Sequence, residues 1–335
     1  MAISTIDNNG VNLGQLGNRN LIQNGNFSVS QRGTSFTADN VYTLDRWKSS
    51  DGTGGSPART LSQQVFTLGQ TDVPNAHYYL RHAQTGASTN GNSSLVQKIE
   101  DVTRSAGQTI TFSFYAKANA SMTVDVRFIQ DFGTGGSPSS DVILTETITI
   151  GTSWAKFTLT KDIGSLSGKT LGTDGVHTSS LDIDMEFQPT GTFTFEIAQV
   201  QLEVGDTATP FEHRSYGAEL ALCLRYFEKF DYANTQFVDS IGYANASSTA
   251  SCMLSYSTKR AAPTITLPPA GTSGGKLAFL TGGGGYPSPV GTLSVQLPSI
   301  TSARIFGTGF GGYTIGQASG LFASGACSIT IDSEL

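Results

Sequence analysis

The stretch IAQVQLEVGDTATPFEHRSYGAELALCLRYF, residues 197–227, ends one β-patterned region and begins the strongest helical pattern in the chain. Ser215 is the expected N-cap, because its hydroxyl can accept from the free amides of the first helical turn. One apolar face follows at helical spacing: Tyr216, Leu220, Cys223, Leu224 and Phe227. Leu222 and Tyr226 lie off that face, and a helix that is apolar on two flanks packs against two surfaces. We predict a helix that joins two β domains, with Leu222 and Tyr226 at an interface between copies of the chain.

The region before this stretch alternates apolar and polar residues with the period of a β-strand. Three inward-facing sets stand out: Ile110, Phe112, Phe114; Met122, Val124, Val126, Phe128; and Leu181, Ile183, Met185, Phe187. In the last strand the inward set changes phase between Ile197 and Val200, which predicts a β-bulge near Ala198–Gln199. Half-buried antiparallel strands between glycine-rich turns favour a sandwich over a parallel α/β sheet.

Composition narrows the function classes. The 335 residues include 39 glycines, 14% are charged, and the net charge is −6, so a phosphate-neutralising surface for nucleic acid is not expected. No run of 18 apolar residues predicts a membrane span, and the first ten residues lack the features of a signal peptide. Three widely spaced cysteines make neither a disulfide framework nor a zinc site, and Cys223 and Cys252 are expected to be buried.

The phrase at 201–226 resembles the junction in structural proteins of tailed phages, tail-fibre proteins especially. There a sandwich closes with Q-L-E-x-G-x-x-A-T-P-F-E, and a helix carrying E-L-x-x-C-x-R-Y follows. The matching positions are Gln201, Leu202, Glu203, Gly205, Ala208, Thr209, Pro210, Phe211, Glu212, Glu219, Leu220, Cys223, Arg225 and Tyr226. Residues 20–28 with 45–47 resemble the opening of carbohydrate-binding-module-like jelly rolls, and 260–267 resembles a strand of the same phage proteins.

The resemblance implies an all-β protein: a jelly-roll β-sandwich, a connecting helix and a second, smaller C-terminal β domain. The expected segments are an N-terminal anchoring arm (1–19), the sandwich (20–212), the helix (213–230) and the C-terminal domain (231–335). Trp47 is expected in the core. Jelly rolls of this kind often hold a structural calcium near the first strand, but the turn at Asn24-Gly25 carries no acidic residue; no other cofactor is expected.

Several patterns resemble motifs of catalytic or binding sites. Gly307–Gly312 matches G-x-G-x-x-G, but no helix follows, so a dinucleotide site is rejected. Asp182, Asp184 and Glu186 share one strand face and could bind calcium or act on a glycosidic bond; a solvated strand face is the favoured interpretation. Candidate glycan contacts in expected loops are Tyr42, Tyr78, Tyr79, Tyr286, Phe310 and Tyr313. Candidate anchoring residues of the arm are Ile3, Ile6, Val11, Leu13 and Leu16.

These observations favour a non-enzymatic virion structural protein, made in the host cytoplasm and assembled on the particle. A tail fibre or adhesin that contacts a host surface glycan is the first hypothesis. The alternative is a capsid-decorating or head-fibre protein that stabilises the capsid or projects from it. A glycan-degrading enzyme is the remote third, because the long repeats of a fibre depolymerase are missing. Partners would be other virion proteins, with a homotrimer implied by the resemblance.

Overall fold

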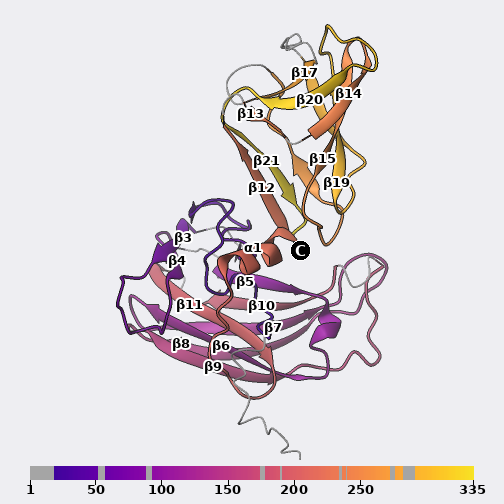
Figure 1. Cartoon of the computed structure of the whole chain (residues 1–335). Coiled ribbons are helices and arrows are strands. Elements are labelled where there is room, and N and C mark those ends of the chain that lie inside the picture. The colour runs from indigo at the N-terminus through magenta and orange to yellow at the C-terminus, as the bar shows by residue number, and fades with distance from the viewer. Residues whose placement is uncertain are drawn as a thin grey trace, which may run out of the picture. The chain divides into compact units, whose positions relative to one another are not determined.

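A computed structural model describes residues 19–51, 57–87, 93–173, 178–188, 191–233, 236–238, 240–271, 276–281 and 291–335. The chain divides between Leu220 and Ala221 into two compact units, the second of which runs to Glu334. Each unit is built from antiparallel strands (Figure 1). No helix among the described residues is long and apolar enough to cross a membrane.

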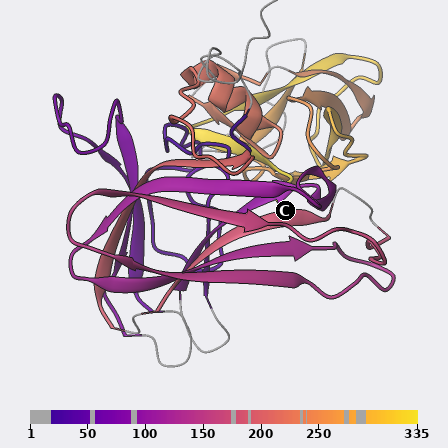
Figure 2. The same cartoon turned by 90° about the horizontal axis from the view of Figure 1, so that it is seen from below.

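The first unit is a sandwich of two sheets, whose long strands are seen side by side in Figure 2. In the described residues, the larger sheet has six strands in the order β1 (Ser35–Phe36), β3 (Arg59–Val65), β4 (Tyr78–Gln84), β11 (Phe193–Val204), β6 (Thr109–Ala118) and β9 (Ala155–Asp162). The facing sheet has five, in the order β2 (Lys48–Asp51), β5 (Ser93–Glu100), β10 (Ser180–Phe187), β7 (Met122–Asp131) and β8 (Val142–Ile150). A short 3-10 helix covers Val102–Arg104. The predicted jelly-roll sandwich is confirmed.

The sandwich core consists of the alternating apolar residues predicted from the sequence. Phe112, Phe128 and Phe187 are all essentially inaccessible to solvent and belong to one cluster. Trp47 is buried there as well, 5.2 Å from the Phe27 ring, and its indole Nε1 donates to the Asn24 carbonyl at 3.0 Å. Burial of these large rings is the main favourable contribution to the stability of the unit.

The predicted bulge in β11 is confirmed, because the register with β6 shifts between Ala198 and Gln201. Gln199 has a positive φ of 49°, a backbone conformation that a residue with a side chain seldom adopts. The bulge allows Val200 and Leu202 to enter the core after Ile197.

The phage-like phrase closes the sandwich through side-chain hydrogen bonds. Glu203, which is buried, accepts from the Thr209 amide at 2.8 Å and from the Thr209 hydroxyl at 2.7 Å. Gln201 Oε1 accepts from the Glu212 amide at 2.8 Å, and Glu212 in turn accepts from the Asn20 amide at 2.7 Å. These residues therefore tie the last strand to the beginning of the unit, which gives the phrase a structural role.

The connecting helix α1 covers Tyr216–Leu224, and the Ser215 hydroxyl accepts from the Ala218 amide at 3.3 Å, as an N-cap does. The helix is shorter than the predicted segment 213–230. Strand β12 (Phe227–Tyr232) begins instead and pairs with β21 (Cys327–Asp332). The pairing partner comes from the far end of the chain, so the local helical pattern could not reveal it.

The second unit contains a small sheet in the order β12, β21 and β16 (Thr264–Thr266). A larger sheet runs in the order β13 (Gln236–Phe237), β20 (Ala318–Ala323), β14 (Ser240–Ala246), β15 (Thr249–Ser255), β19 (Ser302–Thr308) and β18 (Thr292–Gln296), with β17 (Leu277–Thr281) paired to β20. The core of the second unit includes Phe279, Ile305, Phe310, Ile329 and Ile331. Cys223 and Cys252 are buried, as predicted.

Candidate functional site

Two adjoining hollows lie in the first unit on either side of Gln199, the residue at the β-bulge. The first, of about 150 Å³, is lined by Asn26, Ser28, Asn75, Ala76, His77, Tyr78, Gln199 and His213. The second, of about 200 Å³, is lined by Pro74, Asn75, Ser113, Tyr115, Lys156, Gln199, Pro210, Phe211 and His213. Because Asn75, Gln199 and His213 line both, the two hollows form one candidate site.

The bulge in β11 holds this site together. The Gln199 side-chain amide donates to the Pro74 carbonyl, and so fixes the loop before β4 against β11. Pro74 and Asn75 line the site beside it. A bulge re-aims one side chain out of the strand pattern, and strained backbone of this kind is enriched at functional sites.

The lining residues combine aromatic rings with uncharged amides and hydroxyls and with the side chain of Lys156. The rings of His77 and Tyr78 meet edge to face at 4.3 Å, and those of Phe211 and His213 do so at 5.0 Å. Partial burial lowers the pKa of His213, so its imidazole is neutral at physiological pH and can both donate and accept. The amides of Asn26 and Asn75 and the hydroxyls of Ser28 and Ser113 complete a surface able to bind a polyhydroxylated ligand.

An aromatic cluster on the outer face of the six-stranded sheet adjoins the second hollow. Trp154, in the turn before β9, lies 5.3 Å from Phe66 and 5.5 Å from Tyr79, between ring centroids. Tyr115 packs against the same cluster and also lines the hollow. The Lys117 ammonium lies 5.3 Å from the centroid of the Trp154 ring. This cluster extends the aromatic character of the site along the sheet.

The predicted glycan contacts of the first unit are separated by the structure. Tyr78 lines the first hollow. Tyr79, the next residue in β4, points to the opposite face and belongs to the aromatic cluster. Tyr42 lines neither hollow; its ring faces the guanidinium of Arg32 at 5.5 Å and the ammonium of Lys48 at 5.9 Å.

Two predicted glycan contacts of the second unit are wrong. Phe310 is completely buried, 5.9 Å from the Phe279 ring, and Tyr313 is 6% exposed, with a hydroxyl that donates to the Phe279 carbonyl at 3.4 Å. The glycine pattern at 307–312 has a packing role, because a Cβ on Gly307 would lie 2.6 Å from the Phe279 ring. Tyr286 lies outside the described residues.

The residues predicted to anchor the chain and those predicted at an oligomer interface lie in separate parts of the chain. Ile3, Ile6, Val11, Leu13 and Leu16 lie outside the described residues. Tyr226, expected at an oligomer interface, is 2% exposed within the single chain, which corrects that prediction: the chain turns at this residue into β12 and buries its ring. Leu222 is half-buried.

The favoured interpretation of the acidic strand β10, a solvated face, is also wrong. Asp182 and Asp184 are 7% and 8% exposed, and burial raises the pKa of each. Lys98 from β5 lies 3.0 Å from Asp182, and Arg127 from β7 lies 2.6 Å from Asp184 and also pairs with Glu186. Two neighbouring strands thus supply the cations. Within the described ranges, no group of three or more His, Cys, Asp or Glu side chains is placed to hold a metal ion.

Sequence reasoning missed His77, Tyr115, Phe211, His213 and Trp154 as members of the site. Of these, Trp154, which adjoins the hollows through the aromatic cluster, carried a usable signal, because it follows the turn residues Gly151-Thr-Ser and directly precedes the strand β9. The others come from three separate segments that only the fold brings together.

The fold and this site define the first unit as a jelly-roll β-sandwich with a polar and aromatic surface site. No protein-family profile matches the chain, and no curated protein sequence matches it. A similar solved structure is the enzymatically active domain of tailspike protein 4 of bacteriophage CBA120, at 14% identity and a TM-score of 0.38, covering 56% of this chain and 22% of that one.

Two further similar structures come from bacteria. One is a proposed sugar-binding protein from Bacteroides thetaiotaomicron, at 16% identity and a TM-score of 0.37, covering 56% of this chain and all of that one. The other is a family 11 carbohydrate-binding module from Clostridium thermocellum in complex with a mixed-linked tetrasaccharide, at 15% identity and a TM-score of 0.32, covering 52% of this chain and 98% of that one.

Proposed function

We propose that this chain is a non-enzymatic structural protein of a tailed-phage virion, a tail fibre or adhesin whose sandwich unit binds a glycan of the host surface. The observation that carries the proposal is the pair of hollows around Gln199. Their residues offer what a sugar needs, namely ring faces for its apolar side and amides and hydroxyls for its hydroxyl groups.

The hollows are held by rigid elements, which favours specific binding. Tyr78 and Tyr115 come from strands β4 and β6, and Gln199 comes from the bulge in β11. Phe211 and His213 lie in the closure phrase, where the Glu212 amide donates to buried Gln201. A ligand would therefore meet side chains whose positions are already set, and little ordering entropy would oppose binding.

The virion assignment rests on the phage-like phrase at 201–226. In this proposal residues 1–19 attach the chain to other virion proteins, and the chain assembles as a homotrimer. A position on the capsid, as a decoration or head fibre, is the alternative that the first experiment separates from the tail position.

Electron microscopy of intact particles, with a label fused after Leu335, tests the virion role. Label at the tail tip supports the adhesin, and label over the head moves the protein to the capsid. Particles without label at either place would refute the virion role itself.

Binding to purified surface polysaccharides of host bacteria, followed by calorimetry with the full chain, tests the glycan site. Phe211→Ala and His213→Ala should each weaken binding roughly tenfold, equivalent to about 1.4 kcal/mol. Tyr42→Ala is the matched control, because it removes an aromatic ring of the same unit that lines neither hollow. Equal losses in all three variants would show that the hollows are not the binding site.

A further inference from the structure

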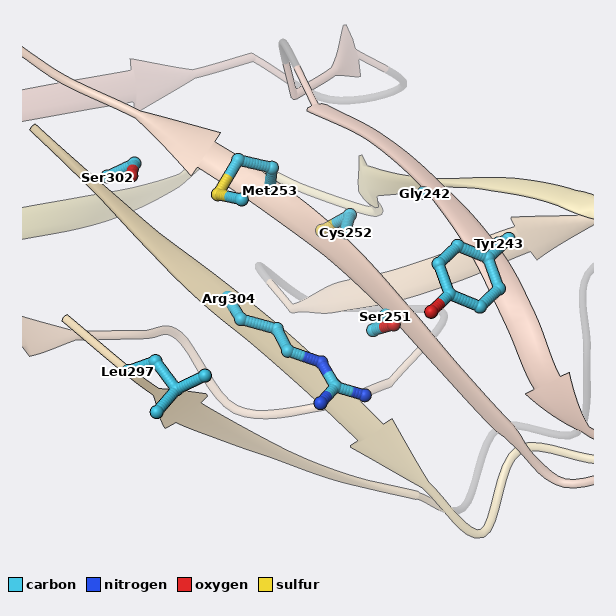
Figure 3. Close-up of a pocket in the computed structure, with 8 residues that line it drawn as sticks. All are labelled: Gly242, Tyr243, Ser251, Cys252, Met253, Leu297, Ser302 and Arg304. Atoms are coloured by element: carbon cyan, nitrogen blue, oxygen red, sulfur yellow. The ribbon is translucent and has the colours of Figure 1, made fainter. Parts of the chain in front are cut away.

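The outer face of the larger sheet in the second unit carries a hollow of about 340 Å³. Strands β14, β15 and β19 form its floor, and Leu297, which follows β18, forms one wall (Figure 3). Tyr243, Met253 and Leu297 are 55%, 52% and 80% exposed. Three large apolar side chains exposed around one hollow are unusual for a surface that only faces water.

Arg304 brings a positive charge to this apolar surrounding. Its guanidinium carbon lies 4.9 Å from the centroid of the Phe306 ring, so the charged plane rests on an aromatic surface. Across the described residues, no carboxylate or carbonyl oxygen accepts from this guanidinium. Arg260 of the same unit differs, since it donates to the carbonyls of Ser333 and Glu334.

The register of the strands places a small residue between two larger groups. Ser251 lies opposite Tyr243 on one side and opposite Phe306, the residue under the Arg304 guanidinium, on the other. Neighbouring strands are about 4.8 Å apart, so Tyr243 and Phe306 are separated by roughly 10 Å across the Ser251 position. In Figure 3 the Tyr243 hydroxyl points toward Ser251, and the Arg304 guanidinium reaches toward it from the other side.

Ser251 is prepared to accept a hydrogen bond. The residue is 4% exposed at the floor of the hollow, and its hydroxyl donates to the Asn245 side-chain oxygen at 2.9 Å, so a bond to a ligand is one that it accepts. The hollow thus offers an acceptor at its floor, a ring at one side and a forked cation at the other.

We propose that this hollow binds a saccharide unit that carries a carboxylate. The carboxylate pairs with the planar Arg304 guanidinium, whose fork matches two carboxylate oxygens. The sugar ring lies over Ser251 and contacts the Tyr243 ring, and a sugar hydroxyl donates to Ser251. Met253 and Leu297 form the edge of the hollow and reduce its contact with water, which strengthens the ion pair. None of these residues lines the hollows around Gln199, so this binding is independent of the proposed function.

Calorimetric titration of the full chain with an oligogalacturonide, and with its methyl ester, tests the charge requirement. The acid should bind and the ester should bind at least tenfold more weakly, because esterification removes the negative charge and keeps the sugar. Binding should weaken between about 0.01 M and 0.15 M ionic strength, as the Debye length falls from roughly 30 Å to 8 Å. An ester that binds as tightly as the acid would overturn the proposal.

Variants assign the binding to this hollow. Arg304→Gln should abolish the difference between acid and ester, and Arg304→Lys should restore only part of it, because an ammonium lacks the fork. Arg104→Gln, which removes one exposed cation from the first unit, is the matched control and should bind as the unchanged chain does. Near-ultraviolet circular dichroism checks that each variant is folded.

Three further results would contradict the proposal. One is acid binding that survives in both Arg304→Gln and Tyr243→Ala. Another is preference for a phosphorylated sugar, such as galactose 6-phosphate, over every carboxylated one. The third is sedimentation showing that Tyr243→Ala dissociates an oligomer of the unchanged chain, since the face would then be covered by a second copy.

Discussion

Buried His82 should make the sandwich unit sensitive to mild acid. The ring is fully buried in β4, stacked 5.4 Å from Phe193 and edge-on 4.7 Å from Phe187. Neither ring nitrogen has a hydrogen-bond partner among the described residues. Burial, aided by the nearby positive charge of Arg59, lowers the pKa of His82 from 6.5 to about 3. The folded chain therefore keeps this imidazole neutral.

The sign and size of the effect follow from proton linkage. Between pH 6.5 and pH 3 the unfolded chain binds a proton at His82 and the folded chain does not, so the free energy of unfolding falls with falling pH. At about 1.4 kcal/mol for each pH unit below 6.5, His82 alone removes about 2 kcal/mol between pH 7.5 and pH 5.0. Asp182 and Asp184, whose pKa values burial raises, act in the opposite direction in the unchanged chain.

The assay compares the unchanged chain with His82→Phe, which keeps a flat ring between Phe187 and Phe193 and removes the titrating group. Urea unfolding is followed by tryptophan fluorescence at about pH 7.5 and pH 5.0. Both tryptophans, Trp47 and Trp154, belong to the sandwich, so the signal reports this unit alone. The carboxylates cancel in the comparison, and the unchanged chain should lose about 2 kcal/mol more than the variant. Equal losses would refute a buried, neutral His82; His82→Leu repeats the comparison should the larger ring strain the core.

Two further predictions concern buried charges. Glu203→Ala should lower the free energy of unfolding of the sandwich by about 1–3 kcal/mol, because the Thr209 amide and hydroxyl lose their acceptor. Urea unfolding followed by tryptophan fluorescence measures this change. An unchanged unfolding midpoint would contradict the stabilising role of the Glu203–Thr209 hydrogen bonds. Lys259→Met should destabilise the second unit by about 3–5 kcal/mol in calorimetry, because Glu228, 2.6 Å from the Lys259 ammonium, is left without its cation. The double variant with Glu228→Gln should recover most of that loss; no recovery would mean that the ion pair is not the cause.

Much of the fold could be predicted because its signals are local. The alternation at Ile110, Phe112 and Phe114 needs only neighbouring residues to indicate a strand with one buried face. The hydroxyl of Ser215 indicates a helix start, and the phase change before Val200 indicates a bulge. In each case the cause and the effect lie within a few residues.

The candidate sites could be predicted only in small part. Of the aromatic residues chosen in expected loops, Tyr78 lines a hollow and Tyr79 joins the aromatic cluster beside it, whereas Phe310 and Tyr313 are buried. A sequence shows that a ring is present in a loop, but the packing of a distant segment decides whether the ring is covered. Arg304 could not be predicted as a binding residue, because the sequence does not show which arginines lack an acceptor within the folded chain.

Periodicity and capping act over a few neighbouring residues, so the sequence is enough to specify an all-β chain, its alternating core, the bulge at Gln199 and the start of the connecting helix. The end of α1 at Leu224 depends on tertiary structure, because the partner of β12 lies about a hundred residues away in β21. It also decided that Asp182 and Asp184 are buried, because Lys98 and Arg127 reach them from neighbouring strands. Strand pairing joins residues that are distant in sequence, and the energy of such pairs depends on neighbours that no local pattern contains.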